Sequence, residues 1–424
     1  MKRGWLFVLL SLIHLTLFAK PTEIVLWHSM AGLLGSELQV LTNGFNQSQK
    51  NVVVKPIYKG DYIESLTSFA AAFRAHVPPA LVQVFEVGTS IMLSPPGIIK
   101  PVHELMKEQG AALPTAHFFP SVFAAYRLHG QLMAMPLNSS VPVLYYNADA
   151  LRQVGYSAET FPKTWDDFEL LAKKLNQTGF SCVYTTAYPA WILIESYSAV
   201  HGLAMMNGHQ KAIYNNPQVI HHLERLLRWQ KSHYFVYGGR SDDATILFTS
   251  GRCPLLSQSS GAYQGMSAMV PFNIGVASIP LDTFASTKRF NNVAGGAALW
   301  VAAGQTPRVY QGIAQFFAYL AKPEVQFYWH QHTGYLPIGI EGDYQFIALK
   351  SEQPTLALAR SEWFGHDLSP DHGHIPAQNQ IRDINDEALE NIFAGIKSPQ
   401  QAMDDAVHRA NHTVGRFLEN TTHA

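Results

Sequence analysis

Short apolar runs of strand length alternate with helical patterns along most of the chain. Residues 23–27, 52–58 and 80–85 are apolar runs with many branched or aromatic side chains, a composition that favours strands. Between the first two runs, residues 36–45 carry leucine and phenylalanine at the spacing of one helix face. This alternation of strands and helices predicts an α/β fold.

Residues 164–179 show the pattern of a capped amphipathic helix. Thr164 with Asp167 three residues later predicts the start of the helix, and Gly179 predicts its end. The apolar residues on the predicted core face are Phe168, Leu171 and Leu175.

Two proline pairs, Asn216-Pro217 and Ser398-Pro399, predict further helix starts. Proline suits the first helical position because the N–H that it lacks would be unpaired there anyway. The apolar stripes behind them are Ile220, Leu223 and Leu227 in one helix, and Ala402, Ala406, Ala410, Val414 and Phe417 in the other. These stripes indicate core packing and say nothing about chemistry.

The first residues have the pattern of a cleavable secretory signal. Lys2 and Arg3 precede an apolar run over residues 5–18, which ends at Ala19. A short basic stretch, an apolar stretch too short to span a bilayer and a small residue predict a signal peptide over residues 1–19. An uncleaved membrane anchor is the alternative. With no later apolar stretch long enough to span, we expect an exported, periplasmic protein.

Length and charge narrow the class of protein. A chain of 424 residues is too long for one hydrophobic core, so two domains are expected. The 30 basic and 31 acidic residues leave no electrostatic footprint for nucleic acid or anionic lipid. Hydrophobic residues at 47% against charged residues at 14% indicate a folded globule rather than a disordered chain.

Two cysteines, Cys182 and Cys253, are present. In an oxidising compartment such a pair is compatible with one disulfide. Because both flank apolar strand-like runs, two buried free thiols remain the alternative.

The sequence lacks the common catalytic motifs, including the nucleophile elbow, the zinc-protease helix, the phosphate-binding loop and the dinucleotide fingerprint. The densest metal candidate is a loop with His366, Asp371, His372 and His374. Spacing alone does not give the fixed geometry that a metal requires, so a solvated loop is the favoured interpretation. We therefore expect neither an enzyme nor a cofactor or metal site.

Several turns, spread along the chain, match one known family. They lie at residues 26–30 (LWHSM), 58–62 (YKGDY), 84–89 (VFEVGT), 138–147 (NSSVPVLYYN), 162–165 (PKTW), 259–261 (SSG), 295–297 (GGA), 332–338 (HTGYLPI) and 380–382 (QIR). In this set the chain resembles the sn-glycerol-3-phosphate-binding proteins of Ugp-type ABC importers, within the larger maltose-binding-like class. The resemblance covers essentially the whole mature chain.

The resemblance implies a fold of two α/β lobes joined by three chain crossings, with the ligand in the cleft between them. The expected lobes are residues 20–140 with 284–322, and residues 141–283 with 323–424. Hinge closure around the solute would create the form that the permease's transmembrane subunits recognise. The expected partners are therefore a small solute and an ABC permease, with no nucleic acid, and the protein is expected to be a monomer.

The resemblance also implies a set of ligand-binding residues. Tyr62 and Glu86 would hold the glycerol hydroxyls, and the residues around the phosphate would be Ser140, Ser259, the backbone N–H of Gly296, Tyr335 and Arg382. The residue chemistry agrees, because an arginine fork suits a phosphate. Glu86 would repel a phosphate, so it is expected at the opposite end of the ligand. Without the resemblance, Arg382 would be assigned to an ion pair with Asp383 or Asp386.

One departure from the family pattern leaves the solute open. Trp191 matches a tryptophan of the family's pocket, but Tyr188 stands where the best-known members have a second tryptophan. A smaller aromatic residue at the cleft mouth leaves room for a choline or ethanolamine group, which Tyr188 or Trp191 could stack on. The resemblance therefore leads us to expect glycerol 3-phosphate or a glycerophosphodiester as the solute. The alternatives are a neutral oligosaccharide, a secreted glycerophosphodiesterase activity, or an adhesion or sensing protein that no longer serves transport.

Overall fold

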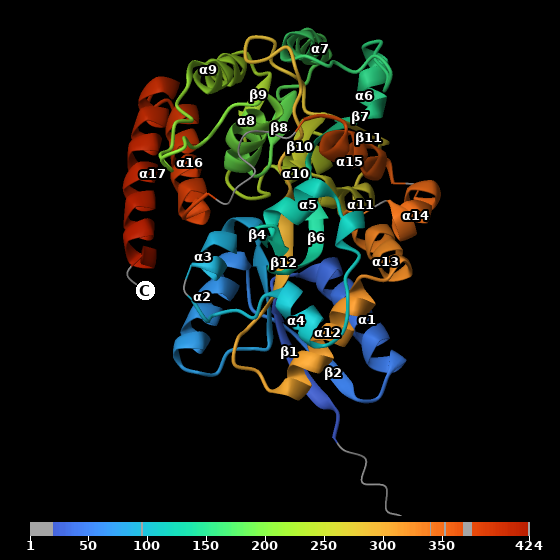
Figure 1. The fold of residues 1–424 in the computed structure, drawn as a ribbon. Helices are drawn as coiled ribbons and strands as arrows, with labels where there is room; N and C mark the ends of the chain where they lie inside the picture. Colours follow the sequence, from blue (N-terminus) through green and yellow to red (C-terminus); the bar gives the residue numbers. More distant parts are fainter. Residues whose placement is uncertain (1–19, 95, 340, 352, 368–374, 423–424) are drawn as a thin grey trace, which may run out of the picture.

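The computed structural model describes residues 20–94, 96–339, 341–351, 353–367 and 375–422 (Figure 1). The predicted signal segment, residues 1–19, lies outside the described residues. Across the described part of the chain, no helix has the length and apolar character needed to cross a membrane.

The first of two five-stranded sheets occupies the lower half of the molecule in Figure 1. Its strands in spatial order are β2 (Val52–Tyr58), β1 (Thr22–His28), β3 (Leu81–Phe85), β12 (Gly295–Val301) and β6 (Met135–Ser140). β1 runs parallel to β2 and β3, whereas β12 is antiparallel to both of its neighbours. A strand from late in the chain is thus inserted between two early strands. Helix α1 (Gly32–Ser48) contacts β2, and α12 (Pro307–Leu320) contacts β1, as α2 (Tyr62–Arg74) also does.

The second sheet occupies the upper half of Figure 1. Its strands in spatial order are β11 (Ile274–Ala277), β7 (Pro142–Asn147), β10 (Leu255–Ser259), β8 (Tyr184–Thr186) and β9 (Phe235–Tyr237). β7 is antiparallel to β10 and β11, while β10, β8 and β9 are parallel. The long helices on this side are α7 (Trp165–Gln177), α9 (Pro217–Lys231), α16 (Gln378–Phe393) and α17 (Pro399–Thr422), the last two lying side by side.

Shorter elements connect these layers. The helices are α2 (Tyr62–Arg74), α3 (Thr89–Leu93), α4 (Val102–Glu108), α5 (Pro120–Ala125), α6 (Ala148–Gln153), α8 (Tyr197–Val200), α10 (Thr245–Thr249), α11 (Tyr263–Ser267), α13 (Pro323–Thr333), α14 (Gln345–Lys350) and α15 (Pro354–Phe364). The hairpin strands are β4 (Arg127–Leu128) and β5 (Gln131–Leu132). The 3₁₀ turns are η1 (Glu86–Gly88), η2 (Thr115–His117), η4 (Ser260–Ala262) and η5 (Gly342–Tyr344), and η3 (Ala190–Ser196) is a π-helix.

The predicted elements are confirmed. All three early strands are found within one residue of the predicted ends, and the predicted helix at residues 36–45 lies inside α1. The Thr164 hydroxyl accepts from the Asp167 N–H at 3.2 Å, and the Asn216 amide oxygen accepts from the Val219 N–H at 3.0 Å. Both predicted caps therefore start their helices.

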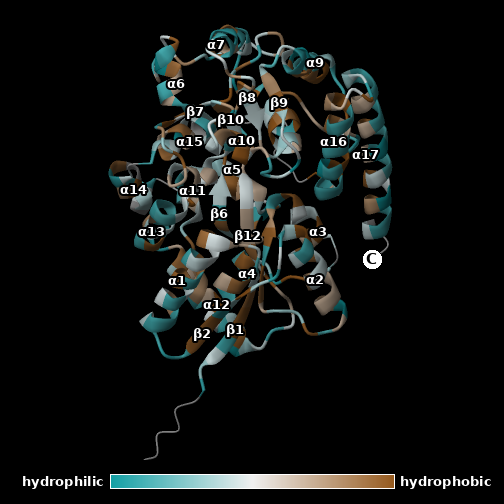
Figure 2. Cartoon of the chain, turned by 180° about the vertical axis from the view of Figure 1, so that it is seen from behind, coloured by the Kyte–Doolittle hydropathy of each residue, from teal (hydrophilic) through white to brown (hydrophobic). Residues whose placement is uncertain are grey.

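Apolar side chains form two buried clusters: the first covers the first sheet and reaches one side of β7 and β10, and the second lies on the second sheet. The first includes Leu26, Val84, Trp300 and Trp329, and the second is centred on the core faces of α7, α9, α16 and α17. Figure 2 shows hydrophobic strands inside and many hydrophilic positions on the outer helices. The predicted stripes are buried, except that Leu227 and Phe417 are only partly covered.

Cys182 and Cys253 form a disulfide, so of the two alternatives left open by the sequence the structure has the bonded pair. The bridge lies just before the paired strands β8 and β10. It therefore links the amino ends of two neighbouring strands of the second sheet.

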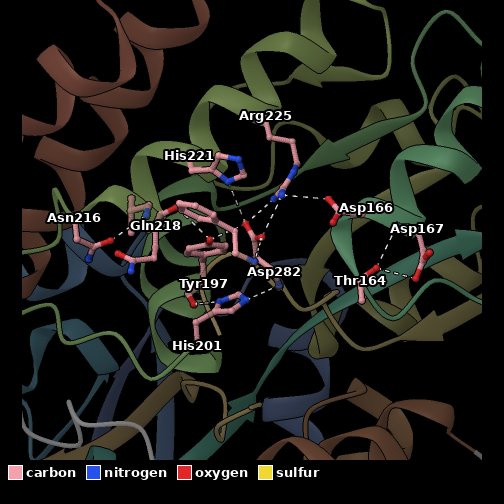
Figure 3. Close-up of polar contacts among 12 residues, drawn as sticks. Thr164, Asp166, Asp167, Tyr197, His201, Asn216, Gln218, His221, Arg225 and Asp282 are labelled. Carbon is pink, nitrogen blue, oxygen red and sulfur yellow. Dashed lines mark hydrogen bonds and ion pairs between the residues drawn. The ribbon is translucent and has the colours of Figure 1, made fainter. Parts of the chain in front are cut away.

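A buried ion pair fastens the segment that leads from the second sheet back to the first (Figure 3). Asp282 follows β11 and is 1% exposed; its carboxylate accepts from Arg225 at 2.6 and 3.1 Å and from the Tyr197 hydroxyl at 2.9 Å. His201 Nε2 accepts from the Asp282 N–H at 2.7 Å. Burial alone would raise the pKa of Asp282, but its bonds to Arg225 outweigh burial and hold the pKa well below its usual range.

Candidate functional site

A cavity of about 250 Å³ lies between the two sheets. All nine residues predicted to bind ligand line it: Tyr62, Glu86, Ser140, Tyr188, Trp191, Ser259, Gly296, Tyr335 and Arg382. Glu86 follows β3, while Ser140 and Ser259 end β6 and β10. Ligands in open α/β sheets bind outside the carboxyl ends of the strands, and these residues lie at such ends. Residues up to 320 positions apart in sequence are therefore brought to one place.

Arg382, on α16, is held between two carboxylates. Its Nε and Nη2 donate to the two oxygens of Glu195 at 2.9 and 2.6 Å. Its Nη1 donates to Glu86 at 2.8 Å. The side chains of Arg382, Glu86 and Glu195 are 18%, 13% and 4% exposed. Burial lowers the pKa of Arg382, but the two glutamates more than offset this, so the guanidinium keeps its charge.

Glu86 therefore does not lie at the opposite end of the site from Arg382, as the sequence led us to expect. A buried guanidinium needs a counter-charge, and Glu86 supplies part of it. Its second oxygen accepts from the backbone N–H of Gly296 at 3.2 Å, so the N–H predicted to face a phosphate is used by Glu86 instead. Burial raises the pKa of Glu86, and Arg382 opposes that rise.

Arg382 still has hydrogen-bonding capacity. A guanidinium carries five N–H groups, and Glu86 and Glu195 take three, which leaves 5 − 3 = 2. The charge balance is less favourable to an anion, because one positive charge faces two carboxylates. The triad of Arg382, Glu86 and Glu195 can thus offer directed donors to a bound group, but it carries no net positive charge.

Two tyrosine rings lie in fixed planes at the cavity. Tyr62, the first residue of α2, stacks on Phe85 with ring centroids 5.2 Å apart. Tyr335 packs against Gly261, where an added Cβ would come within 2.7 Å of the ring, so glycine is needed for this approach. Burial raises the pKa of both tyrosines, and both hydroxyls therefore keep their protons. Each hydroxyl can serve as a neutral hydrogen-bond donor or acceptor.

The two predicted serines differ in their surroundings. Ser140 is 3% exposed at the end of β6. Ser259 caps the turn η4, and its hydroxyl oxygen accepts from the Gly261 N–H at 3.2 Å. The turn continues only into the five-residue helix α11, which is too short to provide a helix-terminus anion site.

Tyr188 and Trp191 form the aromatic side of the cavity. Their rings meet edge to face, with centroids 6.3 Å apart. Tyr188 and Ser241 both have left-handed backbone, with φ of 45° and 36°, and the Tyr188 N–H donates to the Ser241 carbonyl at 2.5 Å. Such strain is stored most often at functional sites. Trp191 is 5% exposed, and its ring N–H has no partner among the described residues.

Four acidic residues at the site were not predicted, namely Glu195, which binds Arg382, and Asp61, Asp383 and Asp386, which line the cavity. Glu195 is the one charged residue in the apolar stretch 190–200, a signal that could have identified it. Asp383 and Asp386 also line the cavity, although the sequence suggested them only as ion-pair partners of Arg382. Burial is the main reason that the pKa of Asp386 is raised to about 6, and Asp386 accepts from the Ala190 N–H at 3.2 Å.

The histidine-rich loop remains largely untested. Asp371, His372 and His374 lie outside the described residues, and His366 sits just before that gap. Within the described ranges, no group of three or more His, Cys, Asp or Glu side chains is placed to hold a metal ion.

Comparison with known proteins identifies the family. The sequence model of bacterial extracellular solute-binding proteins matches residues 41–339. The sn-glycerol-3-phosphate-binding periplasmic protein UgpB of Pectobacterium atrosepticum is 37% identical over 417 residues, which cover 94% of this chain and 93% of that protein. This chain belongs to the bacterial extracellular solute-binding protein family. Membership confirms the family resemblance seen in the sequence, and it makes the protein a periplasmic solute-binding subunit of an ABC importer.

Solved structures confirm the two-lobed fold of this solute-binding protein. UgpB from Mycobacterium tuberculosis, in complex with glycerophosphocholine, matches with a TM-score of 0.78 at 22% identity, over 94% of this chain and 99% of that one. The GacH receptor of Streptomyces glaucescens, solved unliganded and with acarbose, matches with a TM-score of 0.78 at 16% identity, over the same shares. Proteins of this fold thus carry unlike solutes, and the solute must be argued from the site.

Proposed function

We propose that this solute-binding protein captures sn-glycerol 3-phosphate or a glycerophosphodiester and delivers it to its permease. The observation that carries the proposal is Arg382, which lies in the cavity with two N–H groups to spare beside Ser140, Ser259 and Tyr335. A buried phosphate needs several directed donors, and a planar fork gives two of them at once. The relative from P. atrosepticum, which is named for binding sn-glycerol 3-phosphate, supports the same solute.

In this proposal the two ends of the ligand meet different groups. The phosphate takes the free donors of Arg382 with the hydroxyls of Ser140, Ser259 and Tyr335. The glycerol hydroxyls lie between Glu86, which accepts, and Tyr62. The Gly296 N–H acts through Glu86, whose carboxylate it orients, rather than on the phosphate directly.

The aromatic side of the cavity suits a diester with a cationic headgroup. Tyr188 and Trp191 present ring surface for a choline or ethanolamine group, and Asp383 and Asp386 add negative charge along the same lining. A phosphodiester carries one negative charge, whereas a phosphate monoester carries about 1.5 to 2 near pH 7. A cavity in which two glutamates face one arginine accommodates the smaller charge at lower cost.

We also propose that the protein works as a monomer by hinge closure, with lobes of residues 20–140 and 284–322 and of residues 141–283 and 323–424. Cavity residues come from both sheets, which supports closure around the solute. Since α13 contacts α1 and Trp329 belongs to the first cluster, we place the boundary between residues 322 and 323 after α13 instead.

We propose that the solute leaves unchanged, so incubation with glycerophosphocholine should release no choline.

Isothermal titration calorimetry tests the solute class. The mature protein, unfolded and refolded to remove any co-purified solute, is titrated with glycerol 3-phosphate, glycerophosphocholine and maltose. Micromolar binding of either phosphate compound, without maltose binding, supports the proposal and corresponds to about 8 kcal/mol. Light scattering on the same sample checks the monomer. Binding of maltose alone would overturn the phosphate assignment.

One observation favours a second candidate, a neutral oligosaccharide. Arg382 is already outnumbered by Glu86 and Glu195, a balance that a neutral ligand does not disturb. Trp191 would then stack on a sugar ring. The maltose titration, extended to longer oligosaccharides, separates this candidate from the first.

A further inference from the structure

Two wholly buried amides connect the backbone of the first sheet to the cavity. Gln83 lies in β3 and Asn138 in β6, on either side of β12, and both are 0% exposed. The Gln83 side-chain nitrogen donates to the Asn138 side-chain oxygen at 2.8 Å. Buried amides in contact need a consistent direction of donors and acceptors, because a mismatch leaves unpaired polar groups at a high cost.

A single backbone group sets that direction. The Ser29 N–H lies 2.9 Å from the side-chain oxygen of Gln83, and a backbone N–H is only a donor. Gln83 must therefore present its oxygen to Ser29 and its NH₂ group to Asn138. Asn138 in turn must present its oxygen to Gln83 and its own NH₂ group to the far side. The orientation of both amides follows from the chain of partners.

The far side of Asn138 is the tyrosine pair of the cavity. The Asn138 NH₂ group donates to the Tyr62 hydroxyl oxygen at 3.1 Å and also hydrogen-bonds Tyr335. Each tyrosine oxygen is thus occupied as an acceptor. Among the described residues, no hydrogen bond takes up either hydroxyl proton. Because burial raises the pKa of both groups, those protons stay on the oxygens.

We infer that Gln83 and Asn138 form a polar relay that turns the hydroxyls of Tyr62 and Tyr335 into hydrogen-bond donors toward the ligand. Asn138 is then a positioning residue that sets specificity without touching the solute. The relay rests on the proposed function and deepens it. Tyr62 donates a hydrogen bond to a glycerol oxygen, and the O–H of that same glycerol group donates to Glu86. Tyr335 donates to a phosphate oxygen. A ligand that presents N–H or ammonium groups at these two places is rejected.

The test is a double-mutant cycle on binding of glycerol 3-phosphate and glycerophosphocholine by calorimetry. In the wild-type protein, Tyr62→Phe and Tyr335→Phe should each weaken binding about tenfold, since each removes one donor. Asn138→Asp replaces the NH₂ donor with an acceptor. The Gln83 NH₂ group and both tyrosine hydroxyls then donate hydrogen bonds to this carboxylate, which keeps it ionised and turns the hydroxyl donors away from the ligand. In that background, either Tyr→Phe change should alter affinity less than about twofold.

Asn291→Asp is the matched control. Asn291 is 4% exposed, and its NH₂ group donates to the Trp363 carbonyl at 3.1 Å, away from the cavity lining. It should lower stability while each Tyr→Phe change keeps its tenfold cost. If Asn138→Asp does not fold, Asn138→Leu removes the donor that turns the hydroxyls, and the Tyr→Phe costs should then shrink at least threefold. Unchanged Tyr→Phe costs in either Asn138 background would overturn the relay. Failure of the wild-type protein to bind either compound would instead overturn the proposed function.

Discussion

Arg225 and Arg382 both pair with carboxylates that are largely covered, and they differ in where their remaining donors lie and in how their charge is balanced. Arg225 is paired with Asp282, which is 1% exposed, and approaches Asp166 at 3.5 Å on the surface. Arg382 is paired with Glu86 and Glu195, both covered, at the edge of a cavity. At Arg225 one buried carboxylate balances one buried guanidinium. At Arg382 two carboxylates face one guanidinium, and the two N–H groups that remain lie beside the cavity.

The difference separates a structural ion pair from a proposed binding group. Asp282 also accepts from Tyr197 and the Phe284 N–H, so its network is satisfied within the protein and fastens the segment after β11 (Figure 3). Arg382 is paired with Glu86 and Glu195, but its two remaining N–H groups have no protein acceptor among the described residues. Burial, pairing and the number of unused donors therefore do not distinguish the two; the position of those donors beside a cavity does.

The largest expected effect comes from breaking the structural pair. Arg225→Met leaves Asp282 buried without its partner, so the free energy of unfolding should fall by about 3–5 kcal/mol. Urea denaturation followed by circular dichroism measures it. Arg240→Met, which breaks a half-exposed pair with Glu390, is the control and should cost less than about 1 kcal/mol. Solute affinity per folded Arg225→Met molecule should be unchanged. A large loss of affinity would mean that Arg225, like Arg382, acts on the ligand.

Arg382→Lys tests whether the guanidinium of Arg382 binds the ligand. Lysine keeps the charge for Glu86 and Glu195 but loses the planar fork, so phosphate affinity should fall about 100-fold, or about 2.7 kcal/mol. Calorimetry measures this, with Arg225→Lys as the matched control that should leave affinity within about twofold. Equal losses in the two variants would mean that Arg382 acts on stability and not on the ligand.

The carboxylates near the two arginines should respond to pH in opposite directions. Asp386 has a pKa raised to about 6, chiefly by burial, and is faced by the Ala190 N–H, Arg382, Asp383, Arg240 and Tyr237. An acid with a raised pKa holds its proton more tightly when folded, so its contribution to stability increases as pH falls below about 6 and levels off near the unfolded value of about 3.9. Asp386→Asn should remove about 2 kcal/mol of this dependence.

Asp282 supplies the contrast. Its lowered pKa means that its contribution is present above the unfolded value near 3.9 and is lost only in stronger acid. Denaturation curves from pH 7 to pH 4 should therefore show a stability difference between the wild type and Asp386→Asn that changes by about 2 kcal/mol over this range. A difference that stays constant with pH would contradict the raised pKa of Asp386.

The smallest expected effect concerns the exposed carboxylates beside each arginine. Asp383→Asn should weaken glycerophosphocholine binding about threefold and leave glycerol 3-phosphate binding equal or slightly stronger, because it removes negative charge near a cationic headgroup. Asp166→Asn, beside Arg225, is the matched control with no effect on either compound. Equal changes for both compounds would place the headgroup elsewhere.

Local signals made the fold predictable, because strands, caps and apolar stripes are encoded within a few residues of one another. Thr164 and Asn216 cap the helices that the sequence placed behind them. The nine cavity residues could be predicted from the family's turns and not from periodicity. The contacts among them could not: Arg382 and Glu86 are 296 residues apart, and Gln83 and Asn138 are 55 apart. Pairings at such separations leave no pattern in a single sequence.

The central claim is that the two free N–H groups of Arg382 hold the phosphate of the solute. A crystal structure of the protein with glycerol 3-phosphate or glycerophosphocholine tests it most directly. The account predicts phosphate oxygens within about 3 Å of Arg382, with Glu195 still bonded to the Nε side of the fork. A phosphate bound away from Arg382, or a bound solute that makes no hydrogen bond to the two free N–H groups of Arg382, would contradict the account.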